Sequence, residues 1–161
     1  MPTTPIDTPI EDTIADYLVA ALSAATWKGP TSSFTAVIDE APEWDAAEGD
    51  LDNLRVAVVP GPSIEMQFRS PSRGTDRLRV DTGILLSKRV TDKAERKALR
   101  ALRTEIVEKL RQGTLPHVVP SLPEWINLTT VEIETTWDRQ SIGGPRIFMA
   151  AIRVVHEAHL T

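Results

Sequence analysis

Apolar residues along this chain recur first at helical spacing, then at strand spacing, then at helical and finally at strand spacing again. The first helical pattern follows Thr8 and Pro9, which we expect at the N-cap and the first helical position. Glu11, three residues after Thr8, completes a capping box. Gly29-Pro30 is predicted to end this helix. Its buried stripe recurs every fourth residue, at Ile10, Ile14, Leu18 and Leu22.

Three strand-like runs come next. The first covers residues 34–38, and a second alternates between apolar and other residues over 54–58. Alternation resumes over 64–68 after Pro60-Gly61-Pro62, which predicts one bent strand or two short ones because proline cannot donate to a sheet ladder. A turn cluster at 70–74 then predicts that 64–68 pairs with 78–90 as a hairpin.

A long second helix is predicted from Asp92 to Gln112. Asp92 is a suitable N-cap with Glu95 three residues later, and Gly113 is a suitable terminator. Glu105 and Lys109 are spaced to form an ion pair along its surface. The predicted buried stripe consists of Ala98, Leu99, Leu102, Ile106, Val107 and Leu110.

The last part of the chain predicts a hairpin after a proline-rich connection at 116–123. Residues 131–137 alternate as a strand, and Gly143-Gly144-Pro145 turns into a nearly all-apolar strand at 147–155. Such an apolar run is typical of a strand buried on both faces. At 161 residues, the chain is predicted to form a single domain over residues 1–161, with residues 1–8 as a flexible N-terminal segment.

Composition narrows the classes of protein to consider. Hydrophobic residues make up 41% and charged residues 25%, and no apolar stretch approaches the roughly 18 residues that cross a bilayer. The N-terminus lacks the basic and then apolar layout of a secretory signal, so we expect synthesis in the cytoplasm and no membrane partner. The chain has no cysteine, which excludes disulfides, cysteine nucleophiles and thiolate metal sites.

Charge is distributed unevenly along the chain. Residues 1–87 hold 6 basic and 14 acidic residues, residues 88–111 hold 9 and 4, and residues 112–161 hold 3 and 5. The three segments therefore carry −8, +5 and −2, which sum to the net charge of −5. An acidic chain is disfavoured as a general nucleic-acid binder, although one basic face can still attract an acidic partner.

Motifs for catalysis or for metal binding are missing from the sequence. His156 and His159 have a spacing that would need a helix, whereas the sequence there predicts the end of a strand, so we expect surface histidines. Residues 45–52 lack the ligand pattern of a calcium loop, and Ser141-Ile142-Gly143-Gly144 does not match a nucleophile elbow. We therefore expect no enzyme, no metal and no cofactor.

Two basic clusters and one acidic loop are the candidate interfaces. Each can be a solvated polar surface, or the basic and acidic patches can meet between copies of the chain in a head-to-tail contact that closes into a ring. The predicted interface residues are Arg69, Arg73 and Arg77 in the hairpin, Arg96, Lys97, Arg100 and Arg103 on the second helix, and Glu43, Asp45, Glu48 and Asp50 in the loop.

The order of these elements resembles the tail terminator and tail completion proteins of tailed bacteriophages. The resemblance covers roughly residues 12–155. It is carried by Val58-Val59-Pro60-Gly61, by Glu65 with Arg69 and Arg73, and by the segments 78–88, 102–110 and 148–154. It implies an α+β fold, with a mainly antiparallel sheet, one long helix packed on it and an N-terminal helix.

The resemblance further implies a homo-oligomeric ring, of six copies, at the head-proximal end of the tail tube. Such a ring contacts the tail tube protein and the head completion or neck proteins, and genomic DNA passes through it without sequence-specific contacts. It is a virion component of the tail or neck that is made in the host cytoplasm. Another neck component, such as a head-tail stopper, is an alternative.

Two further hypotheses come from other classes of protein. A cytoplasmic adaptor would bind an acidic protein through the basic side of the second helix, and charge reversal at Arg96, Lys97 and Arg100 would weaken that binding. An enzyme would need a concave pocket with converging polar groups, for which the sequence offers no candidate.

Overall fold

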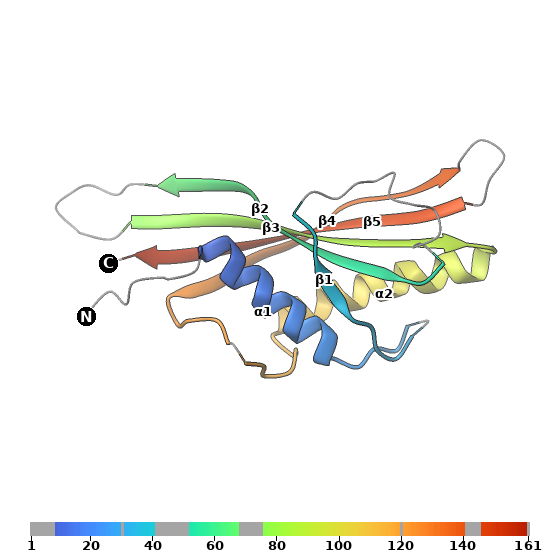
Figure 1. Cartoon of the computed structure of the whole chain (residues 1–161), viewed down its shortest axis with the longest axis horizontal. Helices are drawn as coiled ribbons and strands as arrows, with labels where there is room; N and C mark the ends of the chain where they lie inside the picture. The colour runs from blue at the N-terminus through green and yellow to red at the C-terminus, as the bar shows by residue number, and fades with distance from the viewer. Residues whose placement is uncertain are drawn as a thin grey trace.

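The computed structural model describes residues 9–29, 31–40, 52–67, 76–119, 121–140 and 146–160. It has two helices beneath one long, twisted sheet (Figure 1), which confirms the α+β class and its mainly antiparallel sheet. The elements are α1 (Ile10–Ala24), β1 (Ala36–Ile38), β2 (Arg55–Gln67), β3 (Asp76–Val90), α2 (Lys93–Gln112), β4 (Ile126–Gln140) and β5 (Arg146–Leu160).

The strands are ordered β1-β2-β3-β5-β4 across the sheet. All neighbouring pairs are antiparallel except β1 and β2, which are parallel. β5 pairs along its length with β3 on one side and with β4 on the other, and side chains on both of its faces are buried, Met149 and Val155 on one and Ile152 and Val154 on the other, which accounts for its almost entirely apolar sequence. The predicted hairpin of the last two strands is confirmed, and both strands are longer than the sequence pattern indicated.

β2 is a single strand with a bend in its middle. Its register against β3 shifts between Val59 and Ser63, where Pro60-Gly61-Pro62 interrupts the alternation. Gly61 has a φ of 39°, a backbone conformation that side chains disfavour. Residues 64–67 then pair with 77–80, so the predicted hairpin is confirmed over the described residues.

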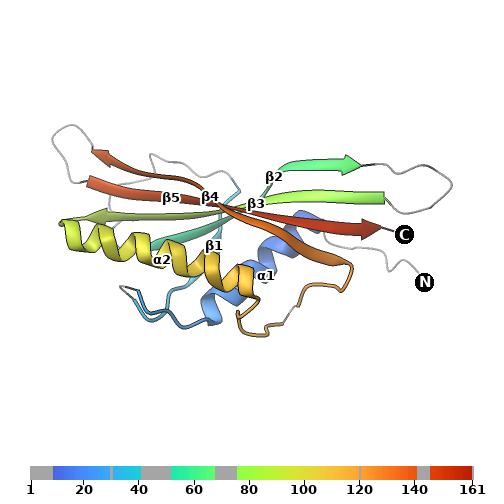
Figure 2. The same cartoon turned by 180° about the vertical axis from the view of Figure 1, so that it is seen from behind.

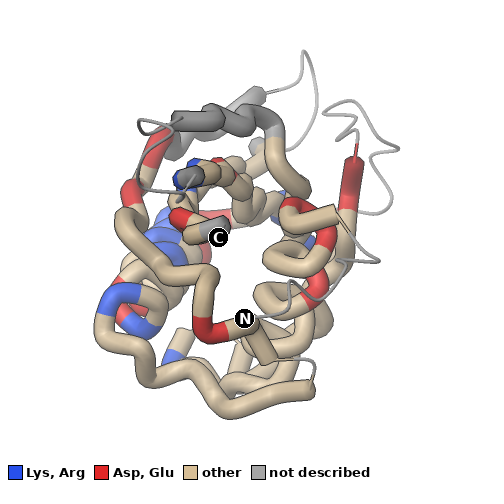
Figure 3. Tube along the Cα trace, turned by 90° about the vertical axis from the view of Figure 1, so that its left-hand side faces the viewer, with Lys and Arg blue, Asp and Glu red and all other residues tan. Residues whose placement is uncertain are grey.

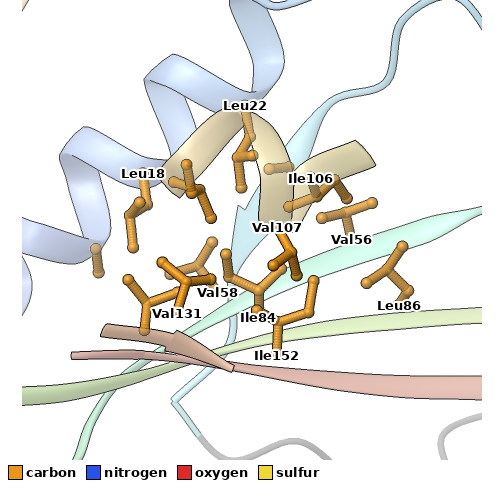
Figure 4. Packing of buried hydrophobic residues seen from close by; sticks show 14 of the residues in the cluster. Leu18, Leu22, Val56, Val58, Ile84, Leu86, Ile106, Val107, Val131 and Ile152 are labelled. Carbon is orange, nitrogen blue, oxygen red and sulfur yellow. The ribbon is translucent and has the colours of Figure 1, made fainter. Parts of the chain in front are cut away.

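Both helices cover the same face of the sheet (Figure 2). α1 packs against β1, β2 and β3, whereas α2 packs against β3, β5 and β4. The two helices therefore lie on opposite flanks of the sheet. The core between them and the sheet includes Leu18 and Leu22 from α1, Ile106 and Val107 from α2, and Val58, Ile84 and Ile152 from the strands (Figure 4).

α1 ends earlier than predicted, at Ala24 and not near Gly29. Ala25 is extended, and the chain then turns so that Trp27 becomes 5% exposed and stacks on Phe34 with ring centroids 5.3 Å apart. Burial of this large indole outweighs the gain from another helical turn. Pro9 is the N-cap and not the first helical residue, while Thr8 lies outside the described residues.

Residues 26–28 are held to α2 by two side chains that we predicted would pair with each other. The Glu105 carboxylate accepts hydrogen bonds from the backbone N–H of Lys28 at 2.7 and 3.0 Å. The Lys109 Nζ donates to the Thr26 carbonyl and lies 4.8 Å from the centre of the Trp27 ring. The predicted pairing of Glu105 with Lys109 is therefore wrong, because both groups instead satisfy the chain that leaves α1.

The ends of α2 match the prediction. Asp92 is the N-cap, and its side chain accepts a hydrogen bond of 2.8 Å from the Glu95 N–H. Gly113 adopts the left-handed conformation, with a φ of 65°, and its N–H donates to the Leu110 carbonyl. Neither of the two helices is long and apolar enough to cross a membrane.

Candidate assembly interface

The first three turns of α2 carry a dense cluster of cations. The only acidic residue among them, Glu95, is already engaged, because it forms an ion pair with Lys88 and accepts a hydrogen bond from the Thr91 N–H. The hydrogen bond from Lys88 is the larger cause, and that from the Thr91 N–H the next, of a lowered pKa of Glu95. The cluster, which we call the α2 basic patch, consists of Lys93, Arg96, Lys97, Arg100 and Arg103.

The α2 basic patch is unfavourable for the helix that carries it. Lys93 and Arg96 lie in the first turn, where positive side chains oppose the helix dipole, and like charges four residues apart, such as Lys93 and Lys97, repel each other. Burial, followed by repulsion from Arg100, lowers the pKa of Arg103. These cations therefore gain no stabilisation from one another within the helix.

Three members of the patch point into solvent. Lys93, Lys97 and Arg100 are exposed, and none of them forms an ion pair with the part of the chain that the structure describes. Arg96 and Arg103 are half-buried and make other contacts. The exposed three are thus available to an acidic partner.

The edge strand β4 lies on the same flank as α2. Its large aliphatic side chains Leu128 and Ile133 are 37% and 41% exposed. Two shifts in its register against β5 interrupt the edge near residues 129 and 134, and the Arg111 guanidinium donates to the Val131 carbonyl at 2.5 and 3.0 Å. Bulges and a charged side chain are devices that limit uncontrolled pairing at a sheet edge.

The opposite flank of the sheet, formed by α1 and β1, carries negative charge on its helix. α1 contains Glu11, Asp12 and Asp16 and no basic residue. None of these carboxylates forms an ion pair within the described residues. On β1, Val37 and Ile38 are both 41% exposed. Figure 3 shows the two flanks end-on, with acidic positions on α1 and basic positions on α2.

The structure brings together only some of the predicted interface residues. Arg96, Lys97, Arg100 and Arg103 share α2, whereas Arg77 lies at the start of β3, the end of that strand remote from α2, and pairs with Glu157 at 3.2 Å. Arg77 is therefore not part of the same patch. The remaining predicted residues lie outside the described part of the chain: Arg69, Arg73, Glu43, Asp45, Glu48 and Asp50.

A group of ion pairs on the face of the sheet away from the helices was not predicted. Asp81 is 7% exposed and accepts hydrogen bonds from Arg153, with the Arg153 Nε at 3.0 Å, while the Arg79 Nε lies 3.6 Å from its other oxygen. The hydrogen bonds that Arg153 donates to the Asp81 carboxylate raise the pKa of Arg153. Asp81 is the one acidic residue in 77–90, and Arg153 is the one lysine, arginine, aspartate or glutamate in the apolar run 147–156; these opposite charges were the signal that could have revealed the pair.

His156 is buried, so the expectation that it lies on the surface is wrong. It is 2% exposed, and no hydrogen-bond partner of its Nδ1 is found among the described residues. Burial lowers the pKa of His156 to about 4. It occupies an inward position of β5, opposite Val80 of β3, so strand alternation directs it to the core.

The described residues contain no group of three or more side chains that could hold a metal ion. The two flanks of the sheet, with α1 on one and α2 on the other, carry opposite charge. Comparison of the sequence with protein-family models and with curated proteins finds no match.

Proposed function

We propose that this chain is a structural virion protein of the tail terminator type, whose copies form a ring that caps the tail tube and joins the tail to the head or neck. DNA passes through the lumen of the ring without sequence-specific contacts. Its partners are other copies of itself, the tail tube protein and a head completion or neck protein. It acts by assembly and not by catalysis.

The exposed cations of the α2 basic patch carry this proposal. Lys93, Lys97 and Arg100 are exposed and form no ion pair within the described residues, so they are available to an acidic surface of another copy or of a partner. The α+β arrangement that the resemblance implies is also present. A long-range pairing of opposite charges between copies would steer assembly and set the orientation of neighbouring copies.

Polymerisation of the cognate tail tube protein provides the test. We expect the added protein to shorten the tubes and to appear at one tube end in negative-stain electron micrographs. The variant Lys97→Glu/Arg100→Glu should lose this effect, whereas Glu108→Gln, a neutralisation at an exposed position on the same helix, should retain it. Tubes of unchanged length with bare ends would reject the proposal.

An adaptor that binds an acidic protein through α2 is the second candidate, and the same exposed cations favour it. An adaptor would leave tube growth unchanged and would remain a monomer or dimer at every protein concentration. The two functions are therefore separated by the tube assay together with the mass of the protein in solution.

A further inference from the structure

We propose that the connection between α2 and β4, residues 114–123, is a docking segment that inserts Val119 into an apolar pocket at the exposed end of the tail tube. This inference rests on the proposed capping function and names the residue and the chemistry of that contact. The segment lies on the side of the sheet that carries the helices (Figures 1 and 2). The structure describes residues 114–119 and 121–123 of it.

The exposure of Val119 is the starting observation. Val119 is 95% exposed, whereas no other large hydrophobic side chain among the described residues is more than 41% exposed. An aliphatic side chain in this position adds no hydrophobic stabilisation to the fold, because that contribution comes from burial. A single exposed valine is common on protein surfaces, so the way in which the chain holds this residue decides the argument.

The segment is attached to the core on both sides of Val119. Leu115 and Leu122 are half-buried and pack against the hydrophobic core. Each of these leucines, and Val119 between them, is followed by a proline, which restricts the preceding residue to an extended backbone. Residues with the same local constraint therefore differ in burial. The outer two attach the segment, and the middle one projects into solvent.

This arrangement prepares the segment for recognition by another protein. No backbone-to-backbone hydrogen bond joins residues 115–119 to the other described residues, so their carbonyl groups can accept hydrogen bonds from a partner. The prolines restrict the free segment, which lowers the entropy lost on binding. Apolar grooves recognise extended, proline-containing segments in this way, whereas addition as a regular strand is disfavoured because proline donates no backbone hydrogen bond.

The absence of charge identifies the kind of partner. Residues 112–123 contain no Lys, Arg, Asp or Glu, so the segment matches an uncharged, apolar pocket and differs from the α2 basic patch. The end of a tube exposes such a surface, because the contact that the next tube subunit would bury is still open and the contacts of permanent oligomers are rich in apolar groups. Val119 docked there would occupy a place that the next tube subunit needs.

Co-sedimentation with preassembled tubes of the cognate tail tube protein tests the contact. Val119→Ala should weaken binding about tenfold, because two buried carbon atoms are lost, and Val119→Asp should weaken it further. Val37→Asp makes the same substitution at another exposed valine, on β1, and should retain binding. Unchanged binding by Val119→Asp, or an equal loss in both aspartate variants, would overturn the inference. Circular dichroism melting verifies that each variant is folded.

Photo-cross-linking identifies the molecule that covers Val119, since the chain has no cysteine of its own. Val119→Cys labelled with a benzophenone maleimide should give, on tubes, a covalent adduct of one copy with one tube subunit. Lys28→Cys, labelled in the same way at an exposed position in another loop, should give none. An adduct of Val119→Cys with a second copy of the chain, and not with the tube protein, would overturn the inference.

These outcomes separate the docking segment from the proposed function. Tube binding and capping that survive Val119→Asp would reject the docking segment and keep the terminator function. A protein that neither binds tubes nor shortens them would reject both.

Discussion

At the scale of single residues, His156 links the stability of the fold to pH. Its pKa is about 4 in the folded protein and about 6.5 in the unfolded chain, so the unfolded chain binds more protons between these values. Stability contributed by neutral His156 is therefore complete above about pH 6.5 and is lost as the pH falls towards about 4.

Because of His156, we expect the unfolding free energy to fall by about 2 kcal/mol when the pH is lowered from 7 to about 4.5. Guanidinium unfolding at the two pH values measures the difference. His156→Leu should reduce the loss by that amount, with the remaining pH dependence arising from carboxylates such as Glu95, whose pKa is lowered. An unchanged pH dependence in His156→Leu would show that the buried imidazole is not responsible.

Among the described residues, Asp81 is the one buried acidic side chain. Asp81→Ala should lower the unfolding free energy, because the Arg153 guanidinium loses the largely buried carboxylate to which it donates. Asp52 offers a matched control, since it also pairs with an arginine but is 62% exposed on its side chain. Asp52→Ala should cost less than about 0.5 kcal/mol. Equal costs in urea unfolding would contradict the distinction.

At the scale of elements, α2 combines a stabilising end with a destabilising one. Lys97→Gln/Arg100→Gln should leave the unfolding free energy unchanged or raise it by about 0.5 kcal/mol, because it relieves repulsion near the helix N-terminus. Arg111→Gln, in the last turn, should lower it by about 1 kcal/mol through loss of the bond to the Val131 carbonyl. Urea unfolding of both variants compares them, and a loss of stability in the first would mean that the α2 basic patch serves the fold.

Local elements could be predicted from the sequence because their signals are local. Asp92 and Gly113 bound α2 through caps that involve only nearby residues, and Pro60-Gly61-Pro62 bends β2 where the alternation breaks. The end of α1 could not be predicted, because burial of Trp27 depends on Phe34 and on the distant Lys109. The order of the strands, and with it the edge position of β4, likewise depends on contacts between residues far apart in the chain.

Part of the candidate interface could be predicted, because its signal in the sequence is also local. A run of cations on one helical face is visible in the sequence, and the structure places Lys97 and Arg100 on the exposed side of α2. The opposition of acidic α1 to basic α2 required knowledge of which flank each helix covers. The pair of Asp81 and Arg153 joins residues 72 positions apart and is set by strand register.

At the scale of the whole molecule, the two flanks of the sheet differ in charge and match in exposed apolar groups. A chain with two unlike flanks can associate repeatedly in one direction, and closure of that series gives a ring. Because charge contributes to this contact at exposed positions, association should weaken as the ionic strength rises.

The mass of the purified protein, measured by light scattering at low and high salt with and without assembled tail tubes, tests the proposed assembly most directly. We predict a ring of six copies, formed either in solution or only on the tubes, that dissociates more readily at high salt. A protein that stays monomeric at every concentration and salt, and whose mass does not change when tubes are added, would contradict the proposal.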